Sequence, residues 1–201
     1  MSGPEAEPGI VDPEAEPDIV AELIADHREL ACLSKELSRP ERAEDGASRR
    51  VVADRLTAAL VAHAAAEEQY LFPAAREYLT GGHEFADAGI GRSRRVEELL
   101  KDLEQSEPTD AHFGDLSGQL ADEIRVHAED QEHTLFPALL RVCEHGILAD
   151  LGVKTRQAKK SAPTRPHPAV PDNPVGSKIV APGVGLVDRV RDFLSGRGGQ
   201  G

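Results

Sequence analysis

The sequence His63-Ala-Ala-Ala-Glu-Glu-Gln-Tyr-Leu-Phe-Pro73 occurs again 64 residues later as His127-Ala-Glu-Asp-Gln-Glu-His-Thr-Leu-Phe-Pro137. In both copies a histidine precedes polar residues by one helical turn, and Leu-Phe-Pro follows. Because residues i and i+4 share one face of a helix, His63 and Glu67 point in the same direction. A histidine and a carboxylate on one inward face, presented twice, are what a helical bundle uses to hold a metal ion.

Four segments around these copies have apolar residues every three or four positions, which predicts amphipathic helices. The first segment begins after Asp18, a good N-cap, and aligns with the third, so the chain contains two similar helical hairpins. We therefore expect an all-α, antiparallel up-down-up-down four-helix bundle over residues 18–160. The expected helices are residues 18–39, 48–79, 84–104 and 110–143, with a bend or reset at Pro73, an end at Gly146 and a shorter helix over 147–160.

The segments outside the bundle differ from it in composition. Residues 1–17 are acidic and rich in proline, which predicts disorder. Residues 161–183 contain six prolines and are expected to form an extended linker. Residues 184–196 predict a short amphipathic helix, which is too short to be stable alone and should dock on the bundle, on a protein partner or on another copy of the chain.

The charge distribution argues against some classes of function. The net charge is −13, but residues 154–201 carry nine Lys or Arg and three Asp, a net of +6, which leaves −19 on the rest. This excess of negative charge before residue 154 argues against a surface that binds nucleic acid. No apolar run is long enough to span a bilayer, and the acidic N-terminus is not a signal peptide. Two cysteines, Cys32 and Cys143, fit a reducing compartment, so a cytoplasmic location is expected.

Over residues 18–145 the chain resembles the hemerythrin-like, or HHE cation-binding, family. A histidine in the first helix, HxxxEE in the second and HxxxxE followed by Leu-Phe-Pro in the fourth carry the resemblance. It implies a non-haem iron site, often with two irons, bridging carboxylates and terminal histidines. Such sites handle dioxygen, hydrogen peroxide, nitric oxide or iron itself. The resemblance carries over these candidate metal ligands: His27, His63, Glu67, Glu68, His127 and Glu132.

The chain departs from the family pattern in its third helix. The family usually has histidine or glutamate ligands there, one turn apart, where this chain has Gly89, Arg92 and Ser93. An amide, Gln131, also stands at the fourth-helix position that corresponds to Glu67. Whether Glu67 or the neighbouring Glu68 is the bridging carboxylate stays open at this point. The site can therefore be mononuclear or asymmetric, a diiron site completed by water or another side chain, or an empty cavity.

Two hypotheses of different classes follow. Histidines and carboxylates within an apolar stripe are costly to bury unless a cation neutralises them, and iron, manganese or zinc suits such ligands. The first hypothesis is a non-haem metalloprotein that handles small molecules. The second is a bundle with a degenerate metal site that acts as an interaction or scaffold protein, its core carboxylates neutralised by Arg92 or Arg95. No general acid, nucleophile or organic-substrate pocket is evident, so no enzyme class is predicted.

Overall fold

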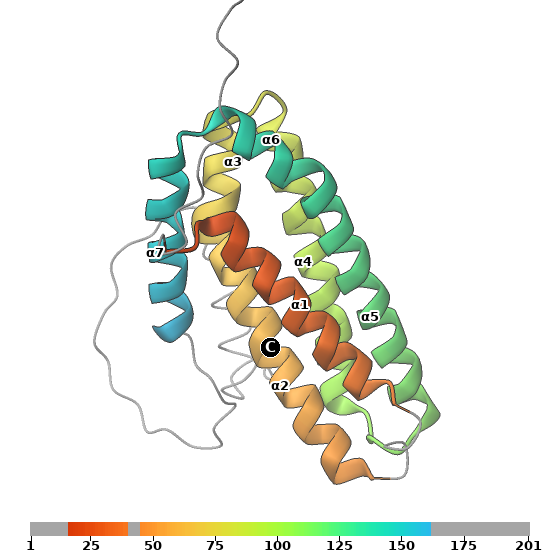
Figure 1. Ribbon diagram of the computed structural model, residues 1–201. Helices are drawn as coiled ribbons and strands as arrows, with labels where there is room; N and C mark the ends of the chain where they lie inside the picture. Colours follow the sequence, from red (N-terminus) through yellow and green to blue (C-terminus); the bar gives the residue numbers. More distant parts are fainter. Residues whose placement is uncertain (1–15, 40–44, 162–201) are drawn as a thin grey trace, which may run out of the picture.

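The computed structural model describes residues 16–39 and 45–161, and this part of the chain is helical apart from short turns (Figure 1). The second predicted helix consists of two α-helices joined by a short π-helical segment, and so does the fourth. In chain order the elements are α1 (Ile19–Leu37), α2 (Gly46–Ala66), η2 (Glu67–Leu71), α3 (Phe72–Tyr78), α4 (Gly82–Gln105), α5 (Ala111–Asp130), η3 (Gln131–Leu135), α6 (Phe136–Val142) and α7 (His145–Ser161).

The helices form an antiparallel bundle. α1 packs against α2 and α5, and α4 packs against α3 and α5, so helices that follow one another in sequence are also neighbours in space. This arrangement confirms the predicted all-α four-helix bundle. A fifth helix, α7, lies outside the bundle against α1 and α2 (Figure 1). The predicted linker and C-terminal helix, and the predicted acidic segment up to residue 15, lie outside the described residues.

The helix ends mostly follow local sequence. Asp18 caps α1 as expected, because its Oδ1 atom accepts a hydrogen bond of 2.8 Å from the backbone N–H of Ala21. The turn into α4 contains Gly81 with φ 80°, a conformation that glycine adopts without strain. The expected break at Gly146 is wrong. The extended backbone of Cys143 (φ −89°, ψ 137°) already ends α6, and Gly146 lies in the first turn of α7.

Both copies of the repeat contain a π-helical turn, which ends at the leucine of Leu-Phe-Pro. The backbone N–H of Phe72 donates to the carbonyl of Glu67, and that of Phe136 donates to the carbonyl of Gln131, five residues back in each case. A proline has no N–H, and its ring crowds the carbonyl four residues earlier. The wider turn relieves this contact, so the predicted reset at Pro73 takes the form of a π-helix rather than a break.

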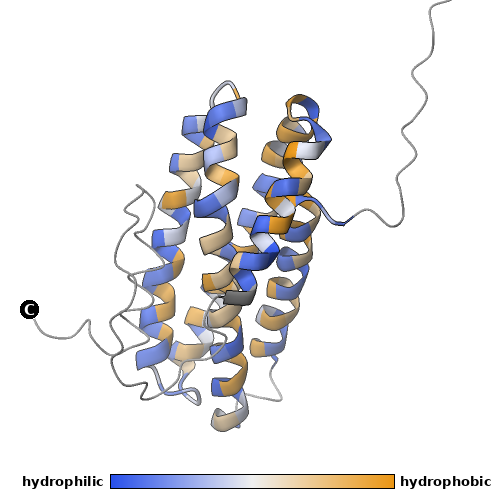
Figure 2. Cartoon of the chain, turned by 90° about the vertical axis from the view of Figure 1, so that its left-hand side faces the viewer, coloured by the Kyte–Doolittle hydropathy of each residue, from blue (hydrophilic) through white to orange (hydrophobic). Residues whose placement is uncertain are grey.

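A polar layer divides the core into two apolar clusters. Along each helix the hydrophobic residues recur between hydrophilic ones, as Figure 2 shows. One cluster fills the bundle around Leu56 and Phe113, and the other fills it around Phe72 and Phe136 and includes Leu148 of α7. Within residues 16–39 and 45–161 no helix is both long and apolar enough to cross a membrane.

Candidate metal centre

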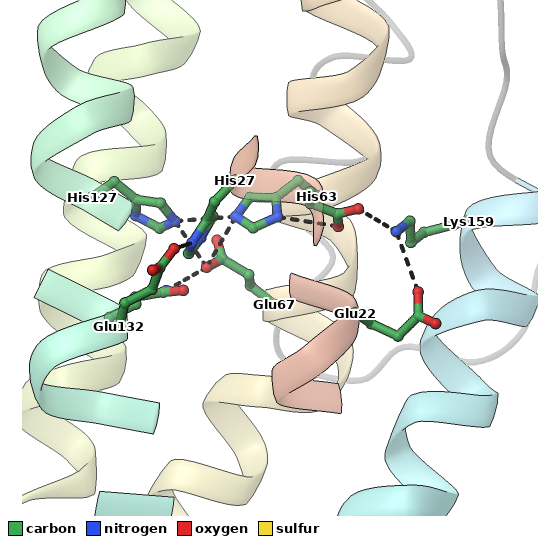
Figure 3. Close-up of polar contacts among 9 residues, drawn as sticks. Glu22, His27, His63, Glu67, His127, Glu132 and Lys159 are labelled. Carbon is green, nitrogen blue, oxygen red and sulfur yellow. Dashed lines mark hydrogen bonds and ion pairs between the residues drawn. The ribbon is translucent and has the colours of Figure 1, made fainter. Parts of the chain in front are cut away.

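Three histidines from three helices meet between the two apolar clusters. His27 of α1, His63 of α2 and His127 of α5 each offer a ring nitrogen, and these nitrogens lie within 4.8 Å of one another. Figure 3 shows the three rings and the Glu67 side chain pointing toward a common centre. His27 and His63 are buried, and His127 is partly exposed. Each histidine occupies a core position of its helix, so the packing of the helices brings the three together.

Glu67 supplies the carboxylate of this cluster. Its Oε1 atom lies 3.4 Å from His63 Nε2 and 3.1 Å from His127 Nε2, and these two nitrogens are 3.1 Å apart. Two ligand atoms that lie about 2.0–2.1 Å from one ion, at roughly 90–109° to each other, are separated by about 2.9–3.4 Å. The three atoms therefore have the spacing of neighbouring ligands of a single ion.

Two further carboxylates determine how the histidine rings are oriented. His27 Nδ1 lies 2.8 Å from Glu132 Oε1, and His63 Nδ1 lies 3.3 Å from Asp26 Oδ2. Because an ionised carboxylate only accepts hydrogen bonds, Nδ1 is the donor in each pair. Nε2 is then the nitrogen with which each ring can bind a cation. Metal-binding histidines are commonly held in this way by a carboxylate on the other ring nitrogen.

Without a metal, the cluster holds a proton. Burial by itself lowers the pKa of His63, but the charge of Glu67 and hydrogen bonds to Asp26 and Glu67 outweigh burial and raise that pKa to about 9. Burial likewise opposes ionisation of Glu67, yet His127 and His63 hold its pKa well below the ordinary value. His63 and Glu67 are therefore a buried imidazolium–carboxylate pair at neutral pH. A cation that binds His63 must displace this proton.

Two acceptor atoms of the cluster are left over. Within the described part of the chain, His27 Nε2 and Gln131 Oε1 are buried without a hydrogen-bond partner. Burial and the charge of His63 lower the pKa of His27 to about 4, so this ring is neutral and its Nε2 carries a lone pair. An unpaired buried acceptor costs about 1–3 kcal/mol, and a cation next to it removes that cost. The donor set therefore fits a metal ion.

The π-helical turn brings two consecutive residues to the cluster. Gln131 donates from Nε2 to Glu67 Oε1, and the next residue, Glu132, accepts from His27. In an ordinary α-helix such neighbours point about 100° apart, but the wider turn brings positions i+4 and i+5 from His127 closer to one face. Periodicity did not predict this turn. Its signal is the pair of polar residues that stands two residues ahead of Leu-Phe-Pro in each copy.

The helix α4 lines the cluster with small or diverted side chains. A Cβ atom at Gly89 would lie 2.4 Å from Phe72 Cζ, so the ring of Phe72 occupies the space of a side chain there. Ser93 donates its hydroxyl to the Gly89 carbonyl at 3.2 Å. Arg92 turns away to Asp130, with Nη2 and Oδ2 2.6 Å apart.

The hypothesis that Arg92 or Arg95 neutralises the carboxylates of the core is wrong for Glu67. Arg95 pairs with Glu123 at 3.0 Å, and Arg92 lies 3.9 Å from the same carboxylate. The histidines, and not these arginines, lie beside Glu67. The two arginines therefore neutralise carboxylates of α5 at the edge of the bundle.

Comparison with known proteins identifies the bundle. A family model described as the hemerythrin HHE cation binding domain matches residues 18–139. The chain belongs to this family. It is also similar to an uncharacterised hemerythrin-like protein of Schizosaccharomyces pombe (strain 972 / ATCC 24843), at 22% identity over 136 residues that make up 67% of each chain. No solved structure gives a significant match. The predicted resemblance is thereby confirmed, and a hemerythrin-like domain indicates binding of non-haem iron or another metal.

Two pockets border the hemerythrin-like cluster, and α4 contributes residues to both. The smaller pocket, of about 40 Å³, is lined by His63, Glu67 and His127 and by apolar residues of α4 such as Val96. The larger pocket, of about 300 Å³, lies along α4 and η3. Arg92 and His127 line both pockets.

The structure sorts the six candidate ligands. Four of them, His27, His63, His127 and Glu67, form the centre, and Glu132 lies against His27. Glu67, rather than the half-buried Glu68, lies between the histidines. That any of the six binds a metal directly stays a prediction.

Sequence reasoning missed Asp26, which lies beside the candidate ligand His27 in sequence and contacts the candidate ligand His63 in space. A charge pattern could have found it. Glu22 and Asp26 lie four residues apart on α1, and Arg156 and Lys159 lie three apart on α7 with the opposite charge.

Proposed function

We propose that this hemerythrin-like chain binds one iron ion through His27, His63, His127 and Glu67 and presents it to a small molecule. The observation that supports the proposal is the close approach of His63 Nε2, His127 Nε2 and Glu67 Oε1, which are 3.1–3.4 Å apart, beside the unpaired Nε2 of His27. Imidazole and carboxylate ligands suit iron; manganese and zinc are the competing metals. Four protein ligands leave coordination positions open for a further molecule.

The remaining residues of the centre hold the ligands in place. Asp26 and Glu132 orient His63 and His27, and Gln131 donates a hydrogen bond to Glu67. Bound iron would supply the capacity to bind or turn over dioxygen, hydrogen peroxide or nitric oxide. A pocket of about 40 Å³ has room for only a few molecules of the size of water, each of which needs roughly 10–15 Å³ on this measure. The pocket beside His63, Glu67 and His127 therefore favours a small molecule such as a diatomic gas or peroxide over a large organic substrate.

A single ion, rather than a diiron centre, is proposed because of α4. A second iron would need ligands on this helix, where Gly89 is covered by Phe72, Arg92 is paired with Asp130 and Ser93 is bonded to the backbone. The four proposed ligands, in contrast, form one group on α1, α2, η2 and α5.

Elemental analysis of protein made in iron-replete cells tests the proposal. We expect close to one iron per chain, and an electron paramagnetic resonance signal on adding nitric oxide to the reduced protein. His27→Ala should lose the metal. His133→Ala is the matched control, because His133 is exposed and bonds only the carbonyl of Glu129 among its described contacts. Two irons per chain would contradict the mononuclear site, and no metal of any kind would contradict the metalloprotein.

A metal-free scaffold is the second candidate function. The observation that favours it is the buried His63–Glu67 pair, in which a proton already balances the carboxylate. Such a bundle should unfold at the same temperature with and without a chelator, whereas a metal that binds only the folded state must raise its stability. The unpaired Nε2 of His27 and Oε1 of Gln131 are what this second candidate leaves unexplained.

A further inference from the structure

The helix α7 lies outside the residues that the family model matches, yet it reaches the metal centre. The match ends at residue 139, and α7 covers His145–Ser161. It packs along the outer side of α1 (Figure 1). Figure 3 shows the Lys159 side chain extending from α7 toward the histidine cluster, with Glu22 beside it.

Lys159 is linked to His63 through one carboxylate. Its Nζ atom forms an ion pair with Asp26 Oδ1, while the other oxygen, Oδ2, lies 3.3 Å from His63 Nδ1. Nζ is also 3.7 Å from Glu22 Oε2. The Asp26 side chain is only 10% exposed. The carboxylate therefore has one oxygen held by α7 and the other by a proposed metal ligand.

This arrangement limits the rotation of Asp26. A carboxylate held at both oxygens has one orientation, and this orientation directs His63 Nδ1 toward α1 and leaves Nε2 for the metal. If the ammonium group were removed, one oxygen of a largely buried carboxylate would lose its partner, which is unfavourable. Asp26 would then turn toward water and release the ring of His63.

The docking of α7 has other supports that do not touch Asp26. Arg156 donates to the carbonyl of Pro17 at 2.6 Å and to Glu22 Oε1 at 3.0 Å. A Cβ atom at Gly152 would lie 2.4 Å from the same carbonyl, so the two segments are in close contact. Leu148 is buried in the apolar cluster. Arg156 thus anchors α7 one turn from Lys159, which makes it a matched control.

We propose that Lys159 is a positioning residue of the metal centre: it holds Asp26, which holds His63 with its Nε2 directed at Glu67 and His127. The metal-binding unit then extends beyond the family match to include α7. This inference rests on the proposed function, because it concerns how one of the proposed ligands is oriented.

Metal titration of the full chain tests the inference. Cobalt(II) and anaerobic ferrous iron would be titrated in competition with a chromophoric chelator, into wild type, K159M, K159R and R156M. K159M should weaken binding by about three- to tenfold and shift the cobalt absorption bands, which is less than the roughly 10–100-fold typical of a residue in direct contact with a ligand. K159R keeps the charge and should restore most of the affinity. R156M should stay within about twofold of wild type, because among its described contacts Arg156 pairs with Glu22 and not with Asp26.

A double-mutant cycle shows whether Lys159 acts through Asp26. D26N should weaken binding by about 10–100-fold. In that background K159M should add nothing, because the carboxylate that transmits its effect is gone. Equal affinities for K159M and R156M, tighter binding by K159M, or additive losses in the double variant would each overturn the inference. If wild type binds neither metal, it is the proposed function that fails.

Hydrogen exchange gives a test that does not depend on the folding of K159M. Coupling between two sites is reciprocal, so if docked α7 favours the metal, cobalt must also favour docked α7. Loading wild type with cobalt should slow amide exchange in residues 153–159, and D26N should abolish that extra protection. Unchanged exchange in α7 of a wild-type protein that has bound cobalt would overturn the inference.

Discussion

The two hairpins of the bundle are built alike but contribute unequally to the metal centre. The hairpin of α1 and α2 supplies three of the four proposed ligands, whereas the hairpin of α4 and α5 supplies only His127. Ser93 stands where the first hairpin has His27, and Gln131 stands where it has Glu67. Even so, the π-helical turn is present in both. The backbone geometry therefore comes from Leu-Phe-Pro and the packing around it, and not from the ligands.

The two phenylalanines of the repeat show how the halves diverge. The ring of Phe136 stacks on His27, with centroids 5.8 Å apart and planes at 13°. The ring of Phe72 packs instead directly on the backbone of Gly89. One half thus uses its phenylalanine to support a proposed ligand, and the other uses it to fill the space that a ligand would need. This difference supports the proposed asymmetric centre.

The largest expected effect comes from giving the first hairpin the residue type that the second hairpin has at the position of Glu67. Glu67→Gln removes the carboxylate that lies 3.1 Å and 3.4 Å from two histidines and that balances the His63 imidazolium. We expect metal affinity to fall by more than about 100-fold, beyond the roughly 10–100-fold loss for a residue that only supports a ligand. Chelator competition with ferrous iron or cobalt measures this loss.

Glu68→Gln is the control for that change. It removes the same charge one residue further along η2, from a side chain that is half-buried. Affinity within about threefold of wild type is expected, well short of the loss on changing a ligand. A large loss in the Glu68 variant, with binding intact in the Glu67 variant, would mean that the neighbouring carboxylate is the ligand.

The next effect is on the stability of the metal-free protein as pH changes. It distinguishes the two buried histidines of the first hairpin. The pKa of His63 is raised to about 9, so its contribution to stability is complete below pH 6.5 and is lost as pH rises from 6.5 to 9. The pKa of His27 is lowered to about 4, so the unfolded state takes up a proton first and stability falls as pH drops from 6.5 to 4. Each limb should span on the order of 3 kcal/mol.

Chemical denaturation across this pH range, with a chelator present, measures both limbs. His63→Gln should flatten the alkaline limb and leave a smaller acid limb, because burial still lowers the pKa of His27 but the charge of His63 no longer does. Bound metal should flatten the alkaline limb as well, because it has already displaced the proton from His63. A metal-free protein as stable at pH 9 as at pH 6.5 would show that the buried imidazolium–carboxylate pair does not form.

The bundle could be predicted from the sequence because the patterns that indicate it are local and occur twice. Apolar residues at helical spacing located the helices, Asp18 located the start of α1, and the duplicated motif indicated the pairing of the hairpins. The error at Gly146 has a physical cause: the chain leaves helical geometry at Cys143, three residues before the glycine. A glycine near a helix end indicates that a turn is close, but tertiary packing decides the residue at which it occurs.

The centre was only partly accessible, because much of it depends on how helices pack. The histidine positions follow from each helix alone, and so does the pairing of His63 with Glu67. That Asp26 of α1 holds His63 of α2, and that Lys159 of α7 holds Asp26, depends on the rotation of three helices relative to one another. The π-helical turns were missed because five residues are too few to change the periodicity of a helix.

Changing the second half to resemble the first should have a moderate and metal-dependent effect. Gln131→Glu replaces an amide that donates to Glu67 by a second carboxylate in a buried position. Like charges at contact should destabilise the metal-free protein by about 2 kcal/mol, and a bound cation should restore most of that stability. Denaturation with and without metal measures both terms.

The exchange variant E67Q/Q131E sharpens this comparison, because it keeps one carboxylate and one amide but reverses their helices. If either hairpin can hold the single carboxylate, the exchange variant should recover most of the metal-free stability that Gln131→Glu alone loses. Metal affinity as low as that of Glu67→Gln would show instead that only the first half can present the carboxylate.

The smallest expected effect concerns the two glycines of α4 that lie two residues apart. At Gly89 an added Cβ would lie 2.4 Å from the buried ring of Phe72, so Gly89→Ala must shift the ring and should cost about 1–3 kcal/mol. At Gly91 nothing lies within 4 Å of such an atom, so Gly91→Ala should stabilise the helix by about 0.5–1 kcal/mol through lower chain entropy. Urea denaturation of the two variants measures the difference directly. Equal stabilities would mean that Phe72 moves freely away from α4, and the second half would then have room for a ligand at position 89 after all.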